Sequence, residues 1–389
     1  MIDLIKNTVK EIIPEIIELR HRLHQIPEIA GKEYKTSALV RETLAGSNID
    51  LLEPFIGTDV VGLLRGREDG RAVALRADMD ALPQTELNNL AYNSTHPGMM
   101  HGCGHDGHTA LLLGTAMVLD KLHDRFNGSV RFVFQPGEEI AALGKDLVEA
   151  GVLLDPEPDA VFALHGFPCL PVGAISSKPG AMMAASDFFT LTIKGKGGHG
   201  SKPESAVDPI NVGAHIVTAL QAMPARQLAA LEPIVVNVCT FHAGDAGNII
   251  PSEAVLGGTT RYFKPEYCQQ IPVMMEKIIA GICEAFGAEY EFKYEQPYIP
   301  VINDSSMVDF ARRITTEYLG EQAWVDMKNP STGGEDFAYF IKRYPGALLH
   351  VGMGEDSQPL HNQRFNFNDD ALVNAVTFMV AATIEFLNQ

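Results

Sequence analysis

The sequence predicts an α/β protein with a mostly parallel, mixed sheet between helices, into which a smaller α+β domain is inserted. Apolar runs rich in Val, Ile and Phe alternate with helical patterns in the first half of the chain, which is typical of a sheet covered on both faces. From Asp187 the order changes to strand, helix, strand, strand, helix, strand, the split βαβ pattern of a ferredoxin-like domain. The length of 389 residues also exceeds one ordinary core.

The first half supplies most elements of the larger domain. A helix is expected from the N-terminus to near the Ile26-Pro27 step, with Pro14 able to kink it. The elements expected next are a helix at 34–45, strands at 60–66 and 72–80, a helix at 108–123, a strand at 129–135, a short helix at 145–151 and a strand at 159–166. These alternating periods predict a doubly covered sheet.

The second half predicts the inserted domain and then a return to the first. Its expected strands are 187–195, 233–244, 253–263 and 288–295, and its expected helices are 208–223 and 266–287. After Pro300 the expected elements are a helix at 305–319, a strand at 346–353 and a helix at 371–389. The sequence therefore predicts a discontinuous larger domain, residues 1–183 and 299–389, and an inserted domain, residues 184–298.

Composition narrows the class of partner. A formal net charge of -19 leaves no basic stripe for nucleic acid or for an anionic membrane surface, so a small-molecule ligand is expected. The N-terminal stretch mixes acidic and basic residues at helical spacing, unlike a signal peptide or a membrane span. Five scattered cysteines without a CxxC motif favour reduced thiols. We therefore expect a cytoplasmic protein.

Polar side chains gather where the expected strands end, and ligand sites in α/β sheets lie at carboxyl ends of strands. The stretch MHGCGHDGH adds a thiol and several imidazoles in a glycine-rich turn. The resulting candidates are Asp78, Asp80, His101, Cys103, His105, His108, Glu138, Glu139, His165 and His361. Thiol, imidazole and carboxylate groups suit Zn²⁺, Co²⁺ or Ni²⁺, and carboxylates extend the range to Mn²⁺. This mixture predicts metal chemistry without naming one ion.

Two adjacent acidic residues that follow a strand can have different roles at a metal site. One carboxylate of the pair Glu138 and Glu139 can bind metal while the other takes a proton from metal-bound water and returns it to a leaving amine. The alternative is a solvated acidic pair at the start of a loop. Asp78 and Asp80 share a face if their strand persists, and each could bind metal or fix the tautomer of an imidazole. We favour the second role for at least one of them.

Other motifs are excluded or read as structural. GKGGHG lacks the GK[ST] of a phosphate-binding loop, and no GxSxG supports a serine hydrolase. His350 is expected to be a core histidine, whereas His21 and His24 are expected to decorate a helix end.

Nine motifs along almost the whole chain resemble those of a known family. In order they are RHRLHQIPE, RADMDALP, MHGCGHDGHTA, FQPGEE, ALHG, GGHGSKP, GNIIP, STGGEDF and PLHN. They resemble the amidohydrolase branch of the metal-dependent aminoacylase and zinc carboxypeptidase-like peptidases, which includes hippurate hydrolases, N-acetyl-diaminopimelate deacetylases and indole-acetyl amino acid hydrolases. The resemblance implies a di-metal peptidase-like catalytic domain with an inserted lid and dimerisation domain.

The resemblance also implies roles for individual residues. It makes Cys103, His105, Glu139, His165 and His361 the ligands of two divalent ions, Mn²⁺ or Zn²⁺ with Co²⁺ or Ni²⁺ as alternatives, and Glu138 the general base and acid. Asp80 and His199 become further catalytic residues, His199 by stabilising the oxyanion, and Asp78 supports the site. Since the carboxypeptidase branch has a histidine where Asp78 stands, which aspartate contacts metal stays open. Asn248 and Arg261 match substrate-binding positions. Gly334 lies in an expected loop before a helix N-terminus, whose backbone N–H groups could also receive the substrate carboxylate.

The expected reaction is metal-dependent hydrolysis of the amide bond of N-acyl-L-amino acids, with closure of the lid during turnover. A homodimer or larger homo-oligomer through the inserted domain is also expected. Rival functions are a dipeptidase or carboxypeptidase with the same ions, and a metal-binding scaffold that has lost catalysis. Glu138 argues against the scaffold, which has no use for a second acid beside Glu139.

Overall fold

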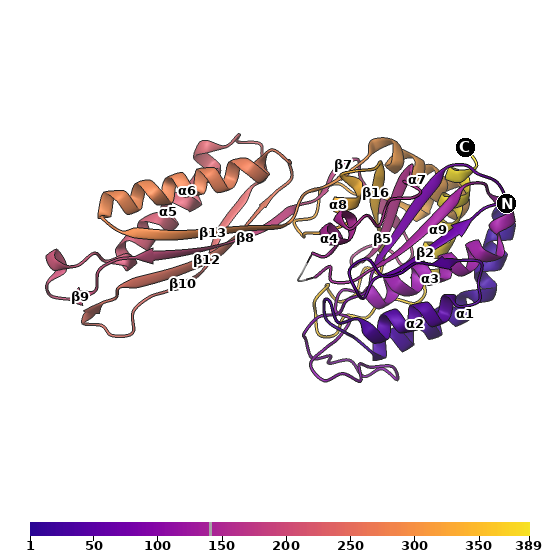
Figure 1. Ribbon diagram of the computed structural model, residues 1–389, viewed down its shortest axis with the longest axis horizontal. Helices are drawn as coiled ribbons and strands as arrows, with labels where there is room; N and C mark the ends of the chain where they lie inside the picture. The colour runs from indigo at the N-terminus through magenta and orange to yellow at the C-terminus, as the bar shows by residue number, and fades with distance from the viewer. Residues whose placement is uncertain (140–141) are drawn as a thin grey trace. The chain divides into compact units, whose positions relative to one another are not determined.

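The computed structural model describes residues 1–139 and 142–389, and these residues form two units (Figure 1). Unit 1 comprises Met1–Met182, Ile302–Pro330 and Asp336–Gln389, and unit 2 comprises Met183–Val301 and Ser331–Glu335. The chain thus leaves unit 1 and returns to it. None of the described helices combines the length and hydropathy needed to cross a bilayer.

A mixed sheet forms the centre of unit 1. Its strands, in spatial order, are β1 (Asp50–Leu51), β2 (Val60–Arg65), β4 (Ser129–Gln135), β3 (Ala72–Asp78), β5 (Ala160–Phe167), β16 (Gly346–Gly352), β6 (Ile175–Ser177) and β15 (Trp324–Asp326). The central strands β4, β3, β5 and β16 run parallel, whereas β2 and β6 pair antiparallel with their neighbours β4 and β16. The predicted mostly parallel, mixed sheet is confirmed.

Helices cover both faces of this sheet. They are α1 (Ile2–Gln25), α2 (Tyr34–Leu44), α3 (His105–Lys121), α4 (Gly144–Glu149), α7 (Ser305–Leu319), α8 (Ala338–Ile341) and α9 (Ala371–Leu387), with short 3₁₀ helices η1 (His123–Arg125) and η3 (Glu321–Ala323). Leu75 and Ala77 of β3 join a core cluster with α1, α3 and α9. Arg76 points to the opposite face because side chains alternate along a strand, and there it lies 6.0 Å from the ring of Phe337, which precedes α8. Buried on both faces, β3 reads as a continuous apolar run up to its last residues.

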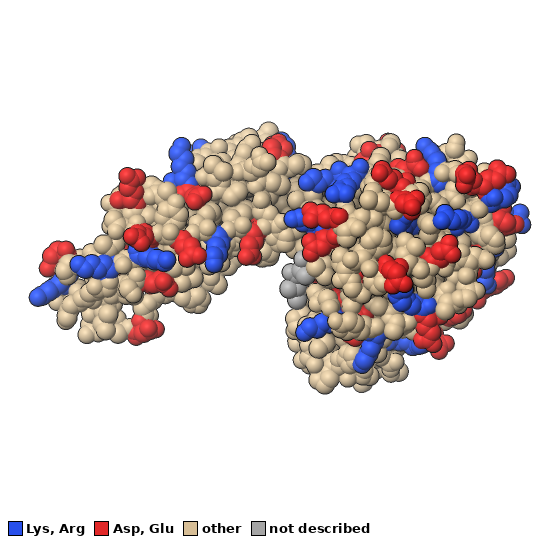
Figure 2. Space-filling model, viewed as in Figure 1, with Lys and Arg blue, Asp and Glu red and all other residues tan. Residues whose placement is uncertain are grey.

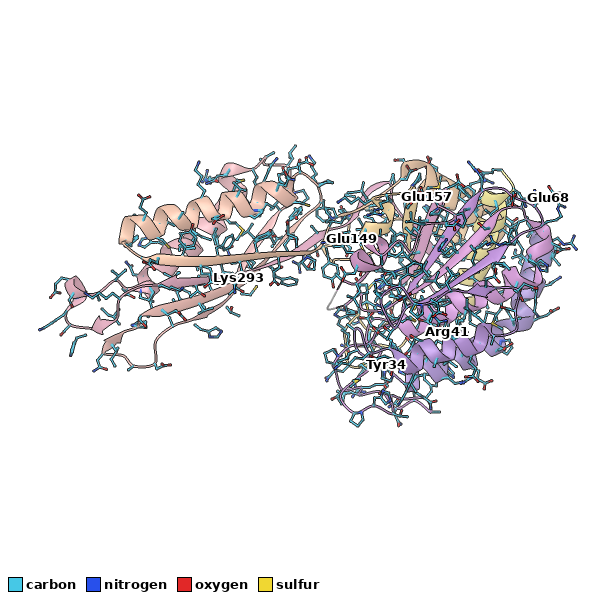
Figure 3. The ribbon with its side chains drawn as sticks, in the orientation of Figure 1. Tyr34, Arg41, Glu68, Glu149, Glu157 and Lys293 are labelled. Carbon is cyan, nitrogen blue, oxygen red and sulfur yellow. The ribbon has the colours of Figure 1, made fainter. Side chains whose placement is uncertain are left out.

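Unit 2 has the order of elements that its sequence predicts. An antiparallel sheet has the strand order β10 (Val235–His242), β12 (Glu253–Tyr262), β8 (Ala185–Lys194) and β13 (Glu289–Tyr298), and its core includes residues of α5 (Pro209–Gln227) and α6 (Tyr267–Phe286). Strand β13 alternates: Tyr290 and Phe292 pack against this core, while Lys293, labelled in Figure 3, is exposed. A second, two-stranded sheet pairs β9 (Gly198–His199) with β11 (Ile249–Ile250), and η2 (Pro203–Ser205) follows β9.

A short two-stranded sheet lies where the chain passes between the units. Strands β7 (Gly180–Met183) and β14 (Val301–Asn303) pair where the chain passes from one unit to the other and back. On the face seen in Figure 2, acidic and basic side chains of the described residues are interspersed, and no broad basic area lies on that face. This mixed surface agrees with the net charge of -19.

Candidate functional site

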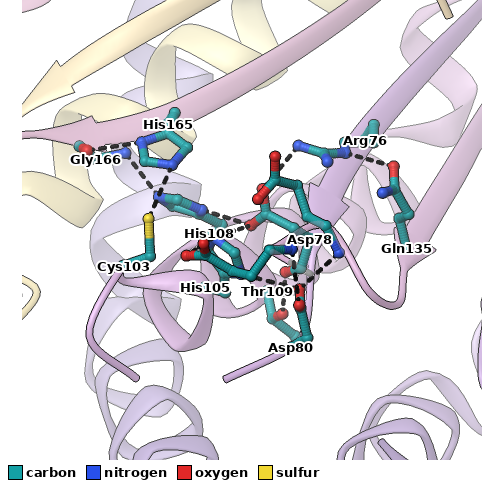
Figure 4. Close-up of polar contacts among 12 residues, drawn as sticks. Arg76, Asp78, Asp80, Cys103, His105, His108, Thr109, Gln135, His165 and Gly166 are labelled. Atoms are coloured by element: carbon teal, nitrogen blue, oxygen red, sulfur yellow. Dashed lines mark hydrogen bonds and ion pairs between the residues drawn. The ribbon is translucent and has the colours of Figure 1, made fainter. Parts of the chain in front are cut away.

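The carboxyl ends of the parallel strands in unit 1 bring several polar groups to one edge of the sheet. Asp78 at the end of β3 pairs in register with Gln135 at the end of β4, and the Glu138-Glu139 turn follows directly. His165 lies near the end of β5. Helix α3 begins at His105, three residues earlier than the sequence pattern indicated, so that its first turn and the preceding Cys103 face the same edge. Figure 4 shows polar contacts within this cluster.

Within the described part of unit 1, potential metal-ligating atoms converge here in three overlapping groups. The groups are Cys103, Glu139 and His361; His105, Glu138 and Glu139; and Asp78, His105, His108 and His165. Within each group the ligand atoms lie within 4.8 Å of one another. The structure therefore brings together all five side chains that the sequence proposed as ligands, together with Glu138.

The thiol and one imidazole are oriented for coordination. His165 Nδ1 lies 2.8 Å from the carbonyl oxygen of Gly166, to which it donates, so that the Nε2 lone pair faces Cys103 Sγ at 3.5 Å (Figure 4). Burial, with His108 beside it, lowers the pKa of His165 well below its usual value and keeps the ring neutral. Burial and the nearby Glu139 raise the pKa of the Cys103 thiol.

His105 lies among carboxylates in an electronegative surrounding. Its Nε2 atom is buried without a hydrogen-bond partner in the described residues, 3.7 Å from Asp78 Oδ1 and 3.8 Å from Glu139 Oε1. Burial lowers its pKa, but Asp78, Asp80 and Glu139 together raise it to about 10. A positive charge is thus stabilised at this point, and a divalent cation would supply one in place of the proton.

Glu139 and His361 complete the same arrangement. Glu139 Oε1 lies 3.1 Å from His361 Nε2, and the backbone of His361 has a φ of 64°, in the left-handed region. Burial raises the pKa of Glu139, yet His361 and His105 lower it overall. Sulfur, nitrogen and oxygen donors, all buried or half-buried except the exposed His361, fit a borderline-soft divalent ion together with the unpartnered ring nitrogen of His105.

Asp80 holds the backbone of the acidic turn. Its Oδ1 accepts the N–H of Glu138 at 3.0 Å and lies 3.2 Å from His105 Nδ1, while its Oδ2 accepts the N–H of Glu139 at 3.0 Å. The predicted strand 72–80 was wrong in its last two residues: β3 ends at Asp78, because Asp80 turns to bind these groups. Both of its oxygens are engaged in fixing the turn and the ring.

Asp78 belongs to a neighbouring buried network. Its Oδ2 accepts from Arg76 Nη1 at 2.7 Å, and its Oδ1 lies 2.6 Å from His108 Nδ1. Arg76 also donates to Gln135 and Asp336. Although burial raises the pKa of Asp78, His105, Arg76 and His108 hold it well below its usual range. The carboxylate is therefore an anion that faces the candidate metal groups.

His108 differs from the other two imidazoles of the cluster. Its Nε2 accepts the N–H of Gly166 at 2.6 Å, which leaves the Nδ1 proton to donate to Asp78. With both ring nitrogens engaged, His108 fixes Asp78 and the backbone beside His165.

His101 is buried without a hydrogen-bond partner among the described residues, and burial lowers its pKa to about 4.

Sequence reasoning misplaced one histidine. His24 was expected to decorate a helix end, but it is buried, with Nδ1 2.8 Å from Asp106 Oδ2 and Nε2 3.0 Å from Glu86 Oε1. His21 remains partly exposed and stacks on Tyr92. The prediction for His24 was wrong because His24 lies four positions after Arg20 and so shares the buried face of α1 with it. Both side chains bind Asp106 of α3. His350 is buried, as expected of a core histidine.

The substrate-binding candidates lie in unit 2. His199 lies on β9 and Asn248 directly precedes β11 in the two-stranded sheet, where the Gly200 N–H donates to the Asn248 carbonyl at 2.8 Å. Arg261 pairs in register with Ser186, and its guanidinium donates to the Thr260 carbonyl. Gly334 also lies against Ser186, since a Cβ there would come within 2.8 Å of the Ser186 Cβ. Arg261 and Gly334 are thus neighbours within this unit.

Comparisons with known proteins agree with this geometry. Residues 74–385 match the model of peptidase family M20/M25/M40. An N-acetylcysteine deacetylase of Bacillus subtilis is 38% identical over 371 residues, which cover 95% of this chain and 96% of that protein. An N-acyl-L-amino acid amidohydrolase of Geobacillus stearothermophilus is 44% identical over 301 residues, 77% of this chain and 80% of that protein. Among solved structures, a dinuclear metal binding M20 peptidase of Bacillus subtilis has a TM-score of 0.85 at 36% identity, covering 97% of this chain and 99% of that one.

Proposed function

Because this chain belongs to peptidase family M20/M25/M40 and is a metal-dependent amidohydrolase, we propose that it hydrolyses the amide bond of N-acyl-L-amino acids. The observation that carries the proposal is the convergence of Cys103, Glu139 and His361 with the His105 and Glu138 pair at one edge of the sheet. The names of two similar proteins, a deacetylase and an amidohydrolase of N-acylated amino acids, support this class of substrate.

Two divalent ions, Mn²⁺ or Zn²⁺, would be held by Cys103, His105, Glu139, His165 and His361, and would supply polarisation of the amide carbonyl and a lowered pKa for water. The unpartnered Nε2 of His105 and the neutral His165 ring support these assignments. Asp78 and Asp80 hold the groups around the proposed ligands in place. Asp78 binds His108 and Arg76, and Asp80 binds His105 and the backbone of the acidic turn.

Glu138 is the proton carrier in this proposal. Its carboxylate takes a proton from the attacking water as the new C–O bond forms. It then gives that proton to the amide nitrogen as the C–N bond breaks, which yields a carboxylic acid and a free amino acid. Support comes from its position: its backbone N–H is fixed by Asp80, and its carboxylate lies within the same group as His105 and Glu139.

His199 is proposed to stabilise the oxyanion. Its Nδ1 accepts the N–H of Ser201 at 3.1 Å, so the neutral ring carries its proton on Nε2 as an exposed donor. Arg261 suits the substrate carboxylate because a guanidinium binds carboxylates with two parallel hydrogen bonds. Asn248 and the backbone at Gly334 are further proposed contacts to the substrate.

The remaining proposals concern the whole protein. We propose that residues 1–183 and 299–389 form the catalytic domain and that residues 184–298 form a lid that also mediates a homodimer. A cytoplasmic location is supported by the five cysteines, all of which are free.

A substrate panel tests the function. The protein, loaded with Mn²⁺ or Zn²⁺, is incubated with acetyl, benzoyl and indole-acetyl amino acids and with dipeptides, and the released amine is measured. Hydrolysis of the acylated amino acids is expected, whereas hydrolysis of dipeptides alone would replace the proposal by a peptidase. Glu138→Ala should bind the same amount of metal and lose hydrolysis, and an active variant would overturn the assigned base.

A further inference from the structure

Two buried carboxylates hold three consecutive backbone N–H groups in the turn that carries Glu138. Asp80 accepts from Glu138 and Glu139, as described above. The N–H of Gly137, just before them, donates to Oε1 of Glu33 at 3.0 Å. Glu33 lies 104 residues earlier in the chain, and neither the sequence motifs nor the metal groups include it.

Glu33 is itself rigidly held. It is fully buried and immediately precedes Tyr34, the first residue of α2, which is labelled in Figure 3. Its Oε1 also accepts the N–H of Gly31 at 3.0 Å, and its Oε2 accepts from Thr58 Oγ1 at 2.7 Å. Burying a carboxylate costs free energy unless hydrogen bonds compensate it, and here the oxygens have three donors. Its oxygens thus connect three segments of unit 1.

The geometry at Gly137 makes this contact decisive for the turn. Gly137 has a φ of 66°, and a Cβ there would lie 2.5 Å from the Leu143 side chain. The Leu143 N–H in turn donates to the Gly137 carbonyl at 3.1 Å. The Gly137 N–H and the Gly137 carbonyl are both hydrogen-bonded, so the peptide groups before and after this residue are held. The direction in which the chain enters Glu138 is therefore fixed as well.

We infer that Glu33 is a positioning residue for Glu138, acting through its hydrogen bond to the Gly137 N–H. This inference rests on the proposed function, in which Glu138 carries the proton. Among the described residues, the side chain of Glu33 bonds Gly31, Thr58 and Gly137, none of which is a proposed metal ligand. It determines where the Glu138 carboxylate lies when the proton is transferred, and small displacements of a catalytic group can slow a reaction greatly.

Paired variants test the hydrogen bond. Glu33→Ala removes the acceptor, whereas Glu33→Gln keeps a side-chain oxygen for the Gly137 N–H and an amide donor for Thr58. We expect kcat of Glu33→Ala to fall about 10- to 100-fold with KM changed by less than about threefold, and Glu33→Gln to restore kcat to within about threefold of wild type. Equal kcat values for Glu33→Ala and wild type would overturn the inference.

Asp159 provides a control for the loss of a carboxylate that holds a backbone N–H group. Its Oδ2 accepts the N–H of Ala72 at 2.8 Å, at the amino ends of β3 and β5, the opposite end of these strands from the acidic turn. Asp159→Ala should lower the melting temperature, yet keep kcat. If both variants lose kcat in proportion to stability, Glu33 has only a structural role and the inference fails.

Hydrogen exchange of the metal-free protein gives a readout independent of activity. Exchange in a peptide that ends at Glu139 should accelerate in Glu33→Ala and remain at the wild-type rate in Asp159→Ala and Glu33→Gln. This measurement also decides the case if Glu33→Ala proves too unstable for kinetics, because Glu33→Asp, one methylene shorter, should show the same acceleration. Unchanged exchange in both would overturn the inference.

The proposed function and the positioning role can fail separately. An active Glu138→Ala variant refutes Glu138 as the proton carrier whatever Glu33 does. An inactive Glu138→Ala combined with a fully active Glu33→Ala refutes only the role of Glu33.

Discussion

Asp80 fixes the acidic turn and a candidate metal ligand at once. Its oxygens receive the N–H groups of Glu138 and Glu139, and Oδ1 also lies beside His105 Nδ1. A carboxylate that orients an imidazole through its far nitrogen also raises the basicity of the nitrogen that binds metal. Asp80 thereby couples the orientation of the ring to that of the proton carrier.

Asp80→Asn should impair both functions. The amide NH₂ that replaces one carboxylate oxygen is a donor and cannot accept an N–H group. In one orientation the N–H of Glu139 loses its acceptor, and in the other the N–H of Glu138 and the His105 ring both lose their partner. We expect metal affinity or kcat to fall about 10- to 100-fold. Metal content after dialysis against a chelator and the steady-state rate measure this, and wild-type values of both would refute the coupling.

His24 makes stability depend on pH. Both of its ring nitrogens face carboxylates, so although burial lowers its pKa, Asp106 and Glu86 raise it to about 9. The groups that face it are Arg20 on α1, Asp106 on α3, and Glu86, Tyr92 and His101 in the intervening loop. Because the folded-state pKa is raised above the ordinary 6.5, this stabilisation is complete below pH 6.5 and is lost as pH rises through 9.

The predicted contribution of His24 is of the order of 3 kcal/mol across that pH window. Urea denaturation of wild type and His24→Gln at pH 6.5, 7.5 and 9 checks this. The difference between their unfolding free energies should shrink as pH rises. A difference that stays constant, or widens, would show that His24 is neutral in the folded protein.

Among the secondary structure elements, α3 depends on close approach to two other helices. A Cβ on Gly114 would lie 2.3 Å from Ile16 Cδ1 of α1 and 3.3 Å from Val376 Cγ2 of α9, and both neighbours are fully buried. Helix α3 carries His105 on its first turn, so this packing positions one end of the candidate site.

Gly114→Ala should therefore destabilise the protein by about 1 to 3 kcal/mol, because overpacking outweighs the better helix propensity of alanine. Gly281 in α6 is the matched control, since a Cβ there meets nothing within 4 Å. Gly281→Ala should stabilise unit 2 by about 0.5 to 1 kcal/mol. Thermal unfolding of both variants measures the two shifts, and shifts of the same sign would contradict the packing argument.

The order of the main helices and strands and the motifs of the candidate site could be predicted from the sequence for a physical reason. Buried strands such as β3 and β4 are rich in apolar residues, so acidic residues at or shortly after their carboxyl ends are conspicuous, as are Asp78 at the end of β3 and Glu138 after β4. Glu33 and His24 carried no such signal. Their partners, Gly137 and Asp106, are 104 and 82 residues away, and only the tertiary fold reveals such pairs.

At the scale of the whole molecule, the two units should respond differently to metal. All five proposed ligands belong to unit 1. A ligand that binds only the folded state stabilises it, by about 2.7 kcal/mol at a free concentration one hundred times its Kd. The stabilisation should thus be confined to the unit that contains the site.

Removal of metal by a chelator should speed hydrogen exchange in β3, β5 and α3, and leave the core of β8, β12 and α6 unchanged. Exchange measured by mass spectrometry on the full chain, with and without added Mn²⁺ or Zn²⁺, tests this. An equal response of both units would indicate binding elsewhere, or unfolding as one cooperative unit.

The position of β16 has a consequence for biosynthesis. This strand pairs with β5 on one side and β6 on the other, although it is translated after the whole of unit 2. While the ribosome is still making unit 2, the nascent chain exposes two open strand edges, and His361 does not yet exist. The proposed metal site can therefore be completed only after His361 has been translated, and until β16 is added the unfinished sheet has unpaired strand edges, which favour aggregation.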